Sequence, residues 1–112
     1  ASFIGGFSLV PGSIEAGHFS IAGSDLAPLR AESGLSGKGV LVIRPEDARP
    51  ADAASLNPMC GTVVSRAFQG RCWRLVVAIG SHRIRLDWPT GPDPGQTLAF
   101  SLPPERCTIL AR

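Results

Sequence analysis

With 112 residues, the chain is long enough for one domain with its own hydrophobic core and too short for two. Hydrophobic residues make up 44% of it and charged residues 18%, a balance typical of globular rather than disordered chains. The net charge of +2 arises from basic residues scattered singly, which argues against the clustered basic face of a nucleic-acid-binding protein.

Glycine and proline punctuate the first half at short intervals and favour short strands over helices. An apolar run is expected to end at the Pro11-Gly12 turn signal, and Gly17 separates two further runs as a hairpin turn would. The run GVLVIR is apolar enough for a buried central strand, and Pro45 ends it. The strands expected in this half are residues 7–10, 13–16, 18–22 and 39–44, with a loop at residues 23–37.

The second half alternates more regularly between apolar and polar side chains. It follows a connector at residues 46–58, which has room for a helical turn at residues 52–56, and Gly80-Ser81 predicts a tight hairpin. The strands expected here are residues 61–68, 71–79, 82–88, 96–102 and 107–110. The sequence therefore predicts an all-β fold, an OB-like β-barrel of about eight or nine short strands with little helix.

The cysteines and histidines do not form a recognisable site in the sequence. Cys60, Cys72 and Cys107 are an odd number in no CxxC pair, which argues against a disulfide framework, and the two histidines lie far from them. We therefore expect half-buried or buried thiols and no metal site. No apolar run approaches the ~20 residues that cross a bilayer, and no signal peptide is recognisable, so we expect a cytoplasmic domain without membrane insertion.

No catalytic motif is complete. Gly37-Lys38 supplies the last Gly-Lys of a phosphate loop, but Glu32 stands where the first glycine belongs and Gly39 where Ser or Thr would hold magnesium. The triplet from Leu35 to Gly37 matches only part of the LSGGQ signature of ABC ATPases. There is no GxSxG motif, and the carboxylates are scattered. We therefore expect no enzyme activity and no cofactor in this chain.

Four segments carry a family resemblance in their order and spacing. They are FIGGFSLVPG at residues 3–12, VIRPED at residues 42–47, GTVVSRAFQG at residues 61–70 and LAFSLPPERCTIL at residues 98–110. Together they resemble the C-terminal transport-associated OB (TOBE) domain of maltose-type bacterial ABC-importer ATP-binding proteins. Ser8 departs from the family's usual Asn in the first segment. The resemblance covers essentially all 112 residues.

The resemblance implies a fold, a host protein and a role. The fold would be a pair of interlocked OB-like barrels, present here as a single accessory domain over residues 1–112. Because the chain opens in an apolar segment without Met, we expect it to be a fragment of a longer ATPase. ATP and magnesium would belong to the absent catalytic domain. The partners would be a second ATPase subunit, in a homodimer, and a membrane permease that holds the complex at the inner membrane.

The motif residues are expected to have structural roles. Arg44 follows a buried strand and can pair with Glu46 or Asp47 to fix the turn that Pro45 begins. Gly61 and Gly70 flank a strand and are expected to supply turn conformations that other residues avoid. The remaining candidates form a self-association surface in the first half of the chain, or else a loop folded over the barrel; they are Phe19, Ile21, Leu26, Leu29 and Leu35.

Two other functions are open to such a barrel. Related barrels of molybdate proteins bind an oxyanion with a segment like S-A-R-N-x-L-x-G-x-V, and residues 57–63 keep its N-x-[LM]-x-G-x-V skeleton. Leu56 replaces the arginine, however, and Pro58 removes a backbone donor. A single-strand nucleic-acid binder would need exposed aromatics, whereas the alternation turns Trp73 and Trp88 inward. The full expected core is Val40, Val42, Ile43, Val63, Leu75, Val77, Ile79, Ile84, Leu86, Leu98, Phe100 and Leu110.

Overall fold

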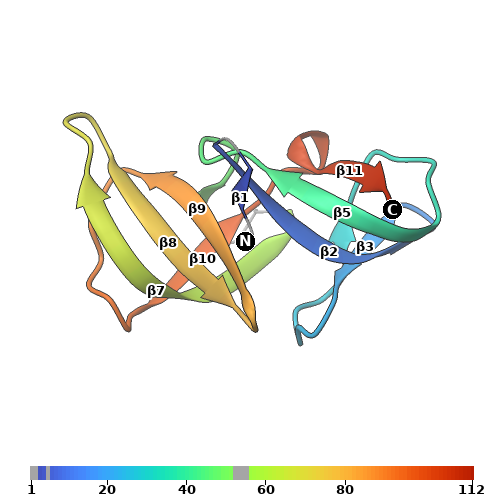
Figure 1. Cartoon of the computed structure of the whole chain (residues 1–112), viewed down its shortest axis with the longest axis horizontal. Helices are drawn as coiled ribbons and strands as arrows, with labels where there is room; N and C mark the ends of the chain where they lie inside the picture. The colour runs from blue at the N-terminus through green and yellow to red at the C-terminus, as the bar shows by residue number, and fades with distance from the viewer. Residues whose placement is uncertain (1–2, 5, 52–55) are drawn as a thin grey trace.

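The computed structural model describes residues 3–4, 6–51 and 56–112. Its strands form two antiparallel sheets, each curled as in an OB-like barrel, and the helical content of these residues is one short 3-10 turn at Pro104–Arg106. The two sheets lie side by side along the long axis of the molecule (Figure 1). We call the first sheet lobe A and the second lobe B. The all-β, OB-like prediction is confirmed.

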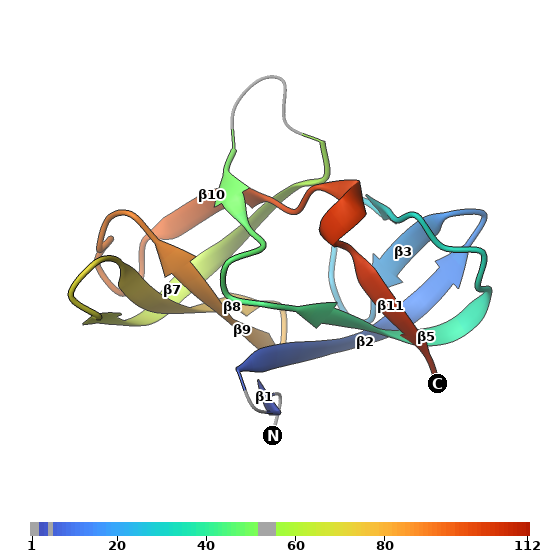
Figure 2. The same ribbon diagram turned by 90° about the horizontal axis from the view of Figure 1, so that it is seen from above.

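Lobe A is built from both ends of the chain. Its sheet has the order β11-β5-β2-β3-β4, with β1 paired to the start of β2. The last strand of the chain therefore lies beside β5 (Figure 2). The strands of lobe A are β1 (Phe3–Ile4), β2 (Phe7–Glu15), β3 (His18–Ile21), β4 (Leu29–Arg30), β5 (Gly37–Ile43) and β11 (Thr108–Ala111).

Lobe B is built from one continuous stretch of chain. Its sheet has the order β6-β10-β7-β8-β9, in which β7, β8 and β9 follow one another as hairpins. The predicted turn at Gly80-Ser81 joins β8 to β9, and Gly80 has a φ of 57°, which favours glycine. The strands of lobe B are β6 (Arg49–Pro50), β7 (Pro58–Phe68), β8 (Trp73–Ile79), β9 (His82–Trp88) and β10 (Thr97–Ser101).

The alternation predicted for β8 and β9 is confirmed. Leu75, Val77 and Ile79 are buried on β8, while the residues between them are only partly covered. On β9 the buried residues are Ile84, Leu86 and Trp88, as expected, and Trp73 packs partly buried against the core. One face of lobe B is thus apolar and buried, and the other meets solvent.

The prediction that Pro11-Gly12 ends a strand was wrong, because β2 runs straight through it. The backbone of Pro11 faces β3, where its carbonyl accepts the N–H of Ala22 at 3.1 Å just past the last residue of that strand. A missing N–H is tolerated at the end of a ladder. Gly12 is required by close approach, since a Cβ there would lie 2.6 Å from the ring of Phe19 and would also clash with the carbonyl of Ser20.

The remaining differences in the first half follow from this longer strand. Residues 13–16, expected as a separate strand, belong largely to β2, and the predicted hairpin is present at Ala16-Gly17, where φ is 51° and 78°. The predicted loop at residues 23–37 contains the short strand β4, paired to β3. Of the helical turn considered at residues 52–56, residues 52–55 lie outside the described residues.

One continuous hydrophobic core connects the two lobes. Ten of the twelve predicted core residues are buried, and nine of these belong to this core, the tenth being Val42 on the outer side of sheet A. Val40 and Leu110 are the exceptions: Val40 is half-buried and Leu110 is 54% exposed. Both lie on the outer face of sheet A, because Leu41 and Ile109, paired to each other one position along, occupy the inner face. A shift of one residue along a strand exchanges its two faces.

Candidate functional site: the junction between the lobes

The two lobes are joined where β2 meets β9. The fully buried hydroxyl of Ser8 accepts a hydrogen bond from the backbone N–H of Arg85 at 2.9 Å. Two residues further along β9, the N–H of Asp87 donates to the carbonyl of Pro45 at 2.8 Å. Two outward N–H groups of β9, those of Arg85 and Asp87, are therefore paired across the junction, which covers this part of the sheet edge.

A buried carboxylate holds the turn that follows β5. Asp47 is 0% exposed, its Oδ2 accepts the backbone N–H of Arg44 at 3.0 Å, and its own N–H donates to the Arg44 carbonyl at 2.9 Å. Two guanidinium groups approach it, that of Arg44 at 4.0 Å and that of Arg106 at 3.7 Å. Of the two partners considered for Arg44, the structure selects Asp47, while Glu46 is exposed. A buried carboxylate with paired cations ties the turn to the end of the chain.

Asn57 forms a second tie at the start of β7. Its Oδ1 accepts the N–H of Arg30 at 2.6 Å, and its Nδ2 lies 2.7 Å from the Arg30 carbonyl and 2.9 Å from that of Leu102. The same Nδ2 lies 3.6 Å from the Sγ of Cys107, whose pKa burial raises to about 11. Asn57 also has a φ of 53°, a conformation that Asn tolerates better than most residues. Its amide is thus fully used within the protein.

The two motif glycines differ in role. Gly70 has a φ of 91° in the turn between β7 and β8. Gly61, expected in a turn, instead lies inside β7, where a Cβ would come within 2.6 Å of the Ala78 carbonyl and of the Val77 side chain. Its role is to let two strands approach closely rather than to turn the chain.

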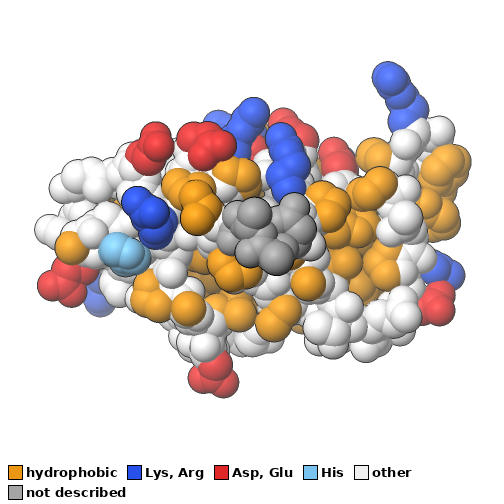
Figure 3. Space-filling view, turned by 180° about the vertical axis from the view of Figure 1, so that it is seen from behind, with side chains coloured by type: hydrophobic (Ala, Val, Ile, Leu, Met, Phe, Trp, Pro, Cys, Tyr) orange, Lys and Arg blue, Asp and Glu red, His pale blue; other side chains and the backbone are white. Residues whose placement is uncertain are grey.

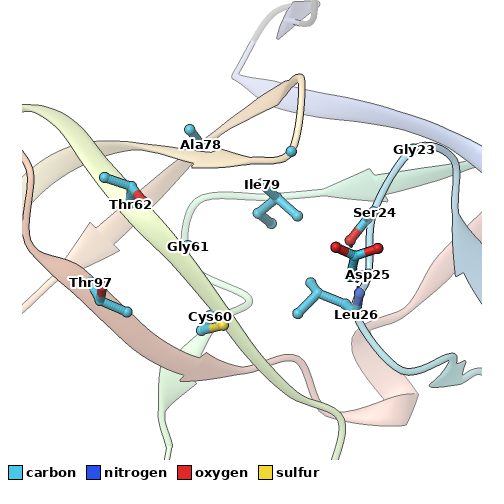
Figure 4. A pocket seen from close by; sticks show the side chains of 11 residues that line it. Gly23, Ser24, Asp25, Leu26, Cys60, Gly61, Thr62, Ala78, Ile79 and Thr97 are labelled. Carbon is cyan, nitrogen blue, oxygen red and sulfur yellow. Dashed lines mark hydrogen bonds between the residues drawn. The ribbon is translucent and has the colours of Figure 1, made fainter.

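A shallow hollow of about 480 Å³ lies between the two lobes, beside Gly61. The loop after β3 closes one side of it, and His82 holds that loop by donating from Nε2 to the Ala22 carbonyl at 2.6 Å. Figure 4 shows Ser24 and Asp25 facing Ile79 across the hollow, with Cys60 on the floor formed by β7. Asp25 is its one acidic lining residue. No group of metal-ligating side chains occurs among the described residues.

Comparison with known proteins covers three of the four resembling segments, those at residues 42–47, 61–70 and 98–110. A profile of the TOBE domain family matches residues 41–110, from the middle of β5 to β11. The chain belongs to the TOBE domain family. TOBE domains are non-catalytic binding or regulatory domains.

A solved structure supports the same fold for this TOBE domain. The cytoplasmic molybdate-binding protein ModG, crystallised with molybdate bound, is 13% identical, with a TM-score of 0.72 over 91% of this chain and 94% of the other. At this identity the likeness concerns the fold. Comparison with curated protein sequences gives no match. No helix in the described part of the chain is long and apolar enough to cross a membrane.

The residues predicted to form a self-association surface in this TOBE domain mostly lie elsewhere. Phe19, Ile21 and Leu29 are buried in the domain's own core, and Leu26 packs against it, so the loop folds over the barrel. Only Leu35 among the five is exposed. The first three were wrongly assigned to the surface, because a strand and its following loop can bury apolar side chains against the neighbouring sheet.

A different part of this TOBE domain exposes apolar surface. The outer side of sheet A carries a patch that we call the apolar face, lined by Phe7, Leu9, Val42, Arg44, Thr108 and Leu110. The Arg44 guanidinium lies over the Phe7 ring, 5.1 Å from its centroid. On the face drawn in Figure 3, basic side chains lie at several places and are interspersed with acidic ones. A nucleic-acid-binding surface would gather the basic ones.

Proposed function

We propose that this TOBE domain is the regulatory accessory domain of an ATP-binding subunit that energises solute import through a bacterial ABC transporter. The observation that carries the proposal is the meeting of three of the four resembling segments at the lobe junction. Residues 3–12 contribute Ser8, residues 42–47 contribute Asp47 and residues 98–110 contribute Arg106, and each makes its contact there. Segments far apart in sequence thus form one structural unit, as expected if the resemblance reflects a shared fold.

The junction gives the domain the rigidity that such a role needs. Ser8 joins β2 to β9, and Asp47 joins the turn after β5 to the last segment of the chain. A domain that holds two ATPase subunits together has to transmit force between them without unfolding locally. In this proposal ATP and magnesium bind the preceding catalytic domain, the parent protein is cytoplasmic at the inner membrane, and it contacts a permease there.

The proposal is tested with the parent protein. The coding sequence directly upstream of residue 1 should encode a GxxxxGK[ST] loop and an LSGGQ signature. In the full-length subunit, removal of residues 1–112 should leave ATP hydrolysis measurable and weaken subunit dimerisation by at least about tenfold in sedimentation equilibrium. An upstream sequence without these motifs, or dimerisation unchanged by the deletion, would contradict the proposal.

Oxyanion sensing is a second candidate, favoured by the fold shared with a molybdate-bound protein over nearly the whole of both chains. The N-x-M-x-G-x-V skeleton at residues 57–63 also fits it. In this chain, however, the side-chain amide of Asn57 is used internally, the side chain of Leu56 has no hydrogen-bond donor, and Pro58 has no backbone N–H. Calorimetric titration with molybdate, tungstate and sulfate decides between the two. A dissociation constant below about 10 µM for molybdate would establish the sensor. The absence of measurable binding heat would support the accessory role.

A further inference from the structure

The outer edge of β11 is an unprotected sheet edge. The N–H of Arg112 donates to Lys38 at 3.2 Å, so the backbones of residues 108, 110 and 112 face β5, and those of Ile109 and Ala111 face away from it. No backbone hydrogen bond within the described residues reaches these two outward positions. β11 also contains no lysine, proline or inward charge, the usual devices that keep an edge from pairing.

The apolar face adjoins this open edge. Thr108 and Leu110 of β11 point to the same side as Leu9 and Val42, in register across β2, β5 and β11. Leu110 is 54% exposed and Phe7 42%. A strand added along β11 would continue the sheet and cover this apolar surface with its own alternate side chains.

One end of the same side is basic. Lys38 and Arg112 are both exposed and line a common hollow of about 440 Å³, whose other lining residues are uncharged. At the other end Arg44 lies over Phe7. In a second copy of this chain, β11 itself has no acidic residue to meet these cations, and the exposed Glu105 lies in the 3-10 turn before the strand rather than in it. Charge complementarity therefore points to an acidic partner segment.

We propose that β11 binds an extended, acidic segment of a partner protein by strand addition. The side chains of that segment opposite Arg112, Leu110 and Thr108 are acidic, apolar and apolar, in that order, since cross-strand neighbours on one face pair directly. Read from its N-terminus, an antiparallel partner has the pattern acidic-x-apolar-x-apolar. This site is separate from the lobe junction and does not depend on the importer assignment.

The test uses the whole chain labelled with ¹⁵N and a peptide of about ten residues in which Thr alternates with Val, with Glu replacing the first two Val. We expect the amides of Ile109 and Ala111 to exchange with solvent at least about tenfold more slowly when the peptide is bound. A peptide with Lys in place of Glu should not bind. Reversing the charge of the site with Lys38→Glu and Arg112→Glu together should reverse this preference, so that the Lys peptide binds and the Glu peptide does not.

The variant Ala111→Pro tests the open edge of β11 without disturbing the fold. It removes an outward N–H and leaves the bonds from residues 110 and 112 to β5 intact, so it should abolish binding while the melting temperature stays within a few degrees. Ala111→Thr, which keeps the N–H, should bind normally. The proposal is overturned if neither peptide binds at millimolar concentration or if the two bind equally. It is also overturned if Ile109 and Ala111 become protected with rising protein concentration alone, which would identify a second copy as the occupant.

Discussion

The two lobes use the same kind of sheet but differ in what they show to the outside. The outer side of lobe B carries charged residues such as Arg83 and Asp87, and Arg74 pairs with Asp87 at 2.8 Å. The outer side of lobe A carries Leu9 and Leu110. An antiparallel sheet with one apolar side needs only its own core, whereas a sheet that is apolar on both sides has surface left for a partner. This difference is the basis for proposing lobe A as the half that contacts a partner.

The largest loss of stability is expected when the side-chain contacts of Asn57, which join the two lobes, are removed. Asn57→Ala leaves the Arg30 and Leu102 groups without partners and places Ala at a φ of 53°. We expect the free energy of unfolding to fall by about 3–5 kcal/mol in urea titration. Asn57→Gly, which tolerates this φ, should recover about 1 kcal/mol of the loss. A loss below about 1 kcal/mol for the alanine variant would mean that the lobes are held together elsewhere.

Within lobe A, the close crossing of β2 and β3 can be tested at Gly12. A Cβ there meets the ring of Phe19 and the backbone of Ser20, so Gly12→Ala should cost about 2–3 kcal/mol. Gly34→Ala is the matched control, because nothing lies within 4 Å of its added Cβ. Thermal unfolding followed by circular dichroism should show a lower melting temperature for the first variant and little change for the second. Equal melting temperatures would contradict the crossing geometry.

One side-chain truncation in each lobe tests whether Leu110 belongs to an exposed face or to the core. Val77→Ala removes buried methyl groups from lobe B and should cost about 1–3 kcal/mol. Leu110→Ala, on the exposed side of lobe A, should change stability by less than about 0.5 kcal/mol. Urea unfolding of both variants measures this. If Leu110→Ala cost as much as Val77→Ala, the side chain would belong to the core and the apolar face would not exist.

The smallest effect is expected on the outer side of lobe B. Arg74→Ala breaks an ion pair whose side chains are 34% and 30% exposed, so it should cost less than about 1 kcal/mol. The cost should shrink further at about 1 M salt, where charges are screened within a few ångströms. Stability measured at low and high salt tests this. A cost that salt does not change would indicate lost packing of the arginine stem rather than lost charge.

The sequence predicted lobe B well and lobe A only in part. In β9, charged and apolar side chains alternate, so only one register buries the apolar set. In β11, Ile109 and Leu110 are adjacent and equally apolar, so the pattern does not say which faces inward. At the site, the Arg44–Asp47 turn is local and could be anticipated. Asn57 contacts Arg30 and Leu102, which are 27 and 45 residues away in the sequence, and no local pattern predicts these contacts.

The position of β11 also bears on how the molecule forms. Lobe B comes from a continuous stretch of chain joined by short hairpins, and such local contacts form quickly. Lobe A pairs β5 with a strand that follows it by more than sixty residues. During synthesis β5 would leave the ribosome long before β11 does, and its edge would stay open meanwhile. Completion of lobe A is then the last and slowest step of folding, and β5 is the segment most exposed to misassembly before it.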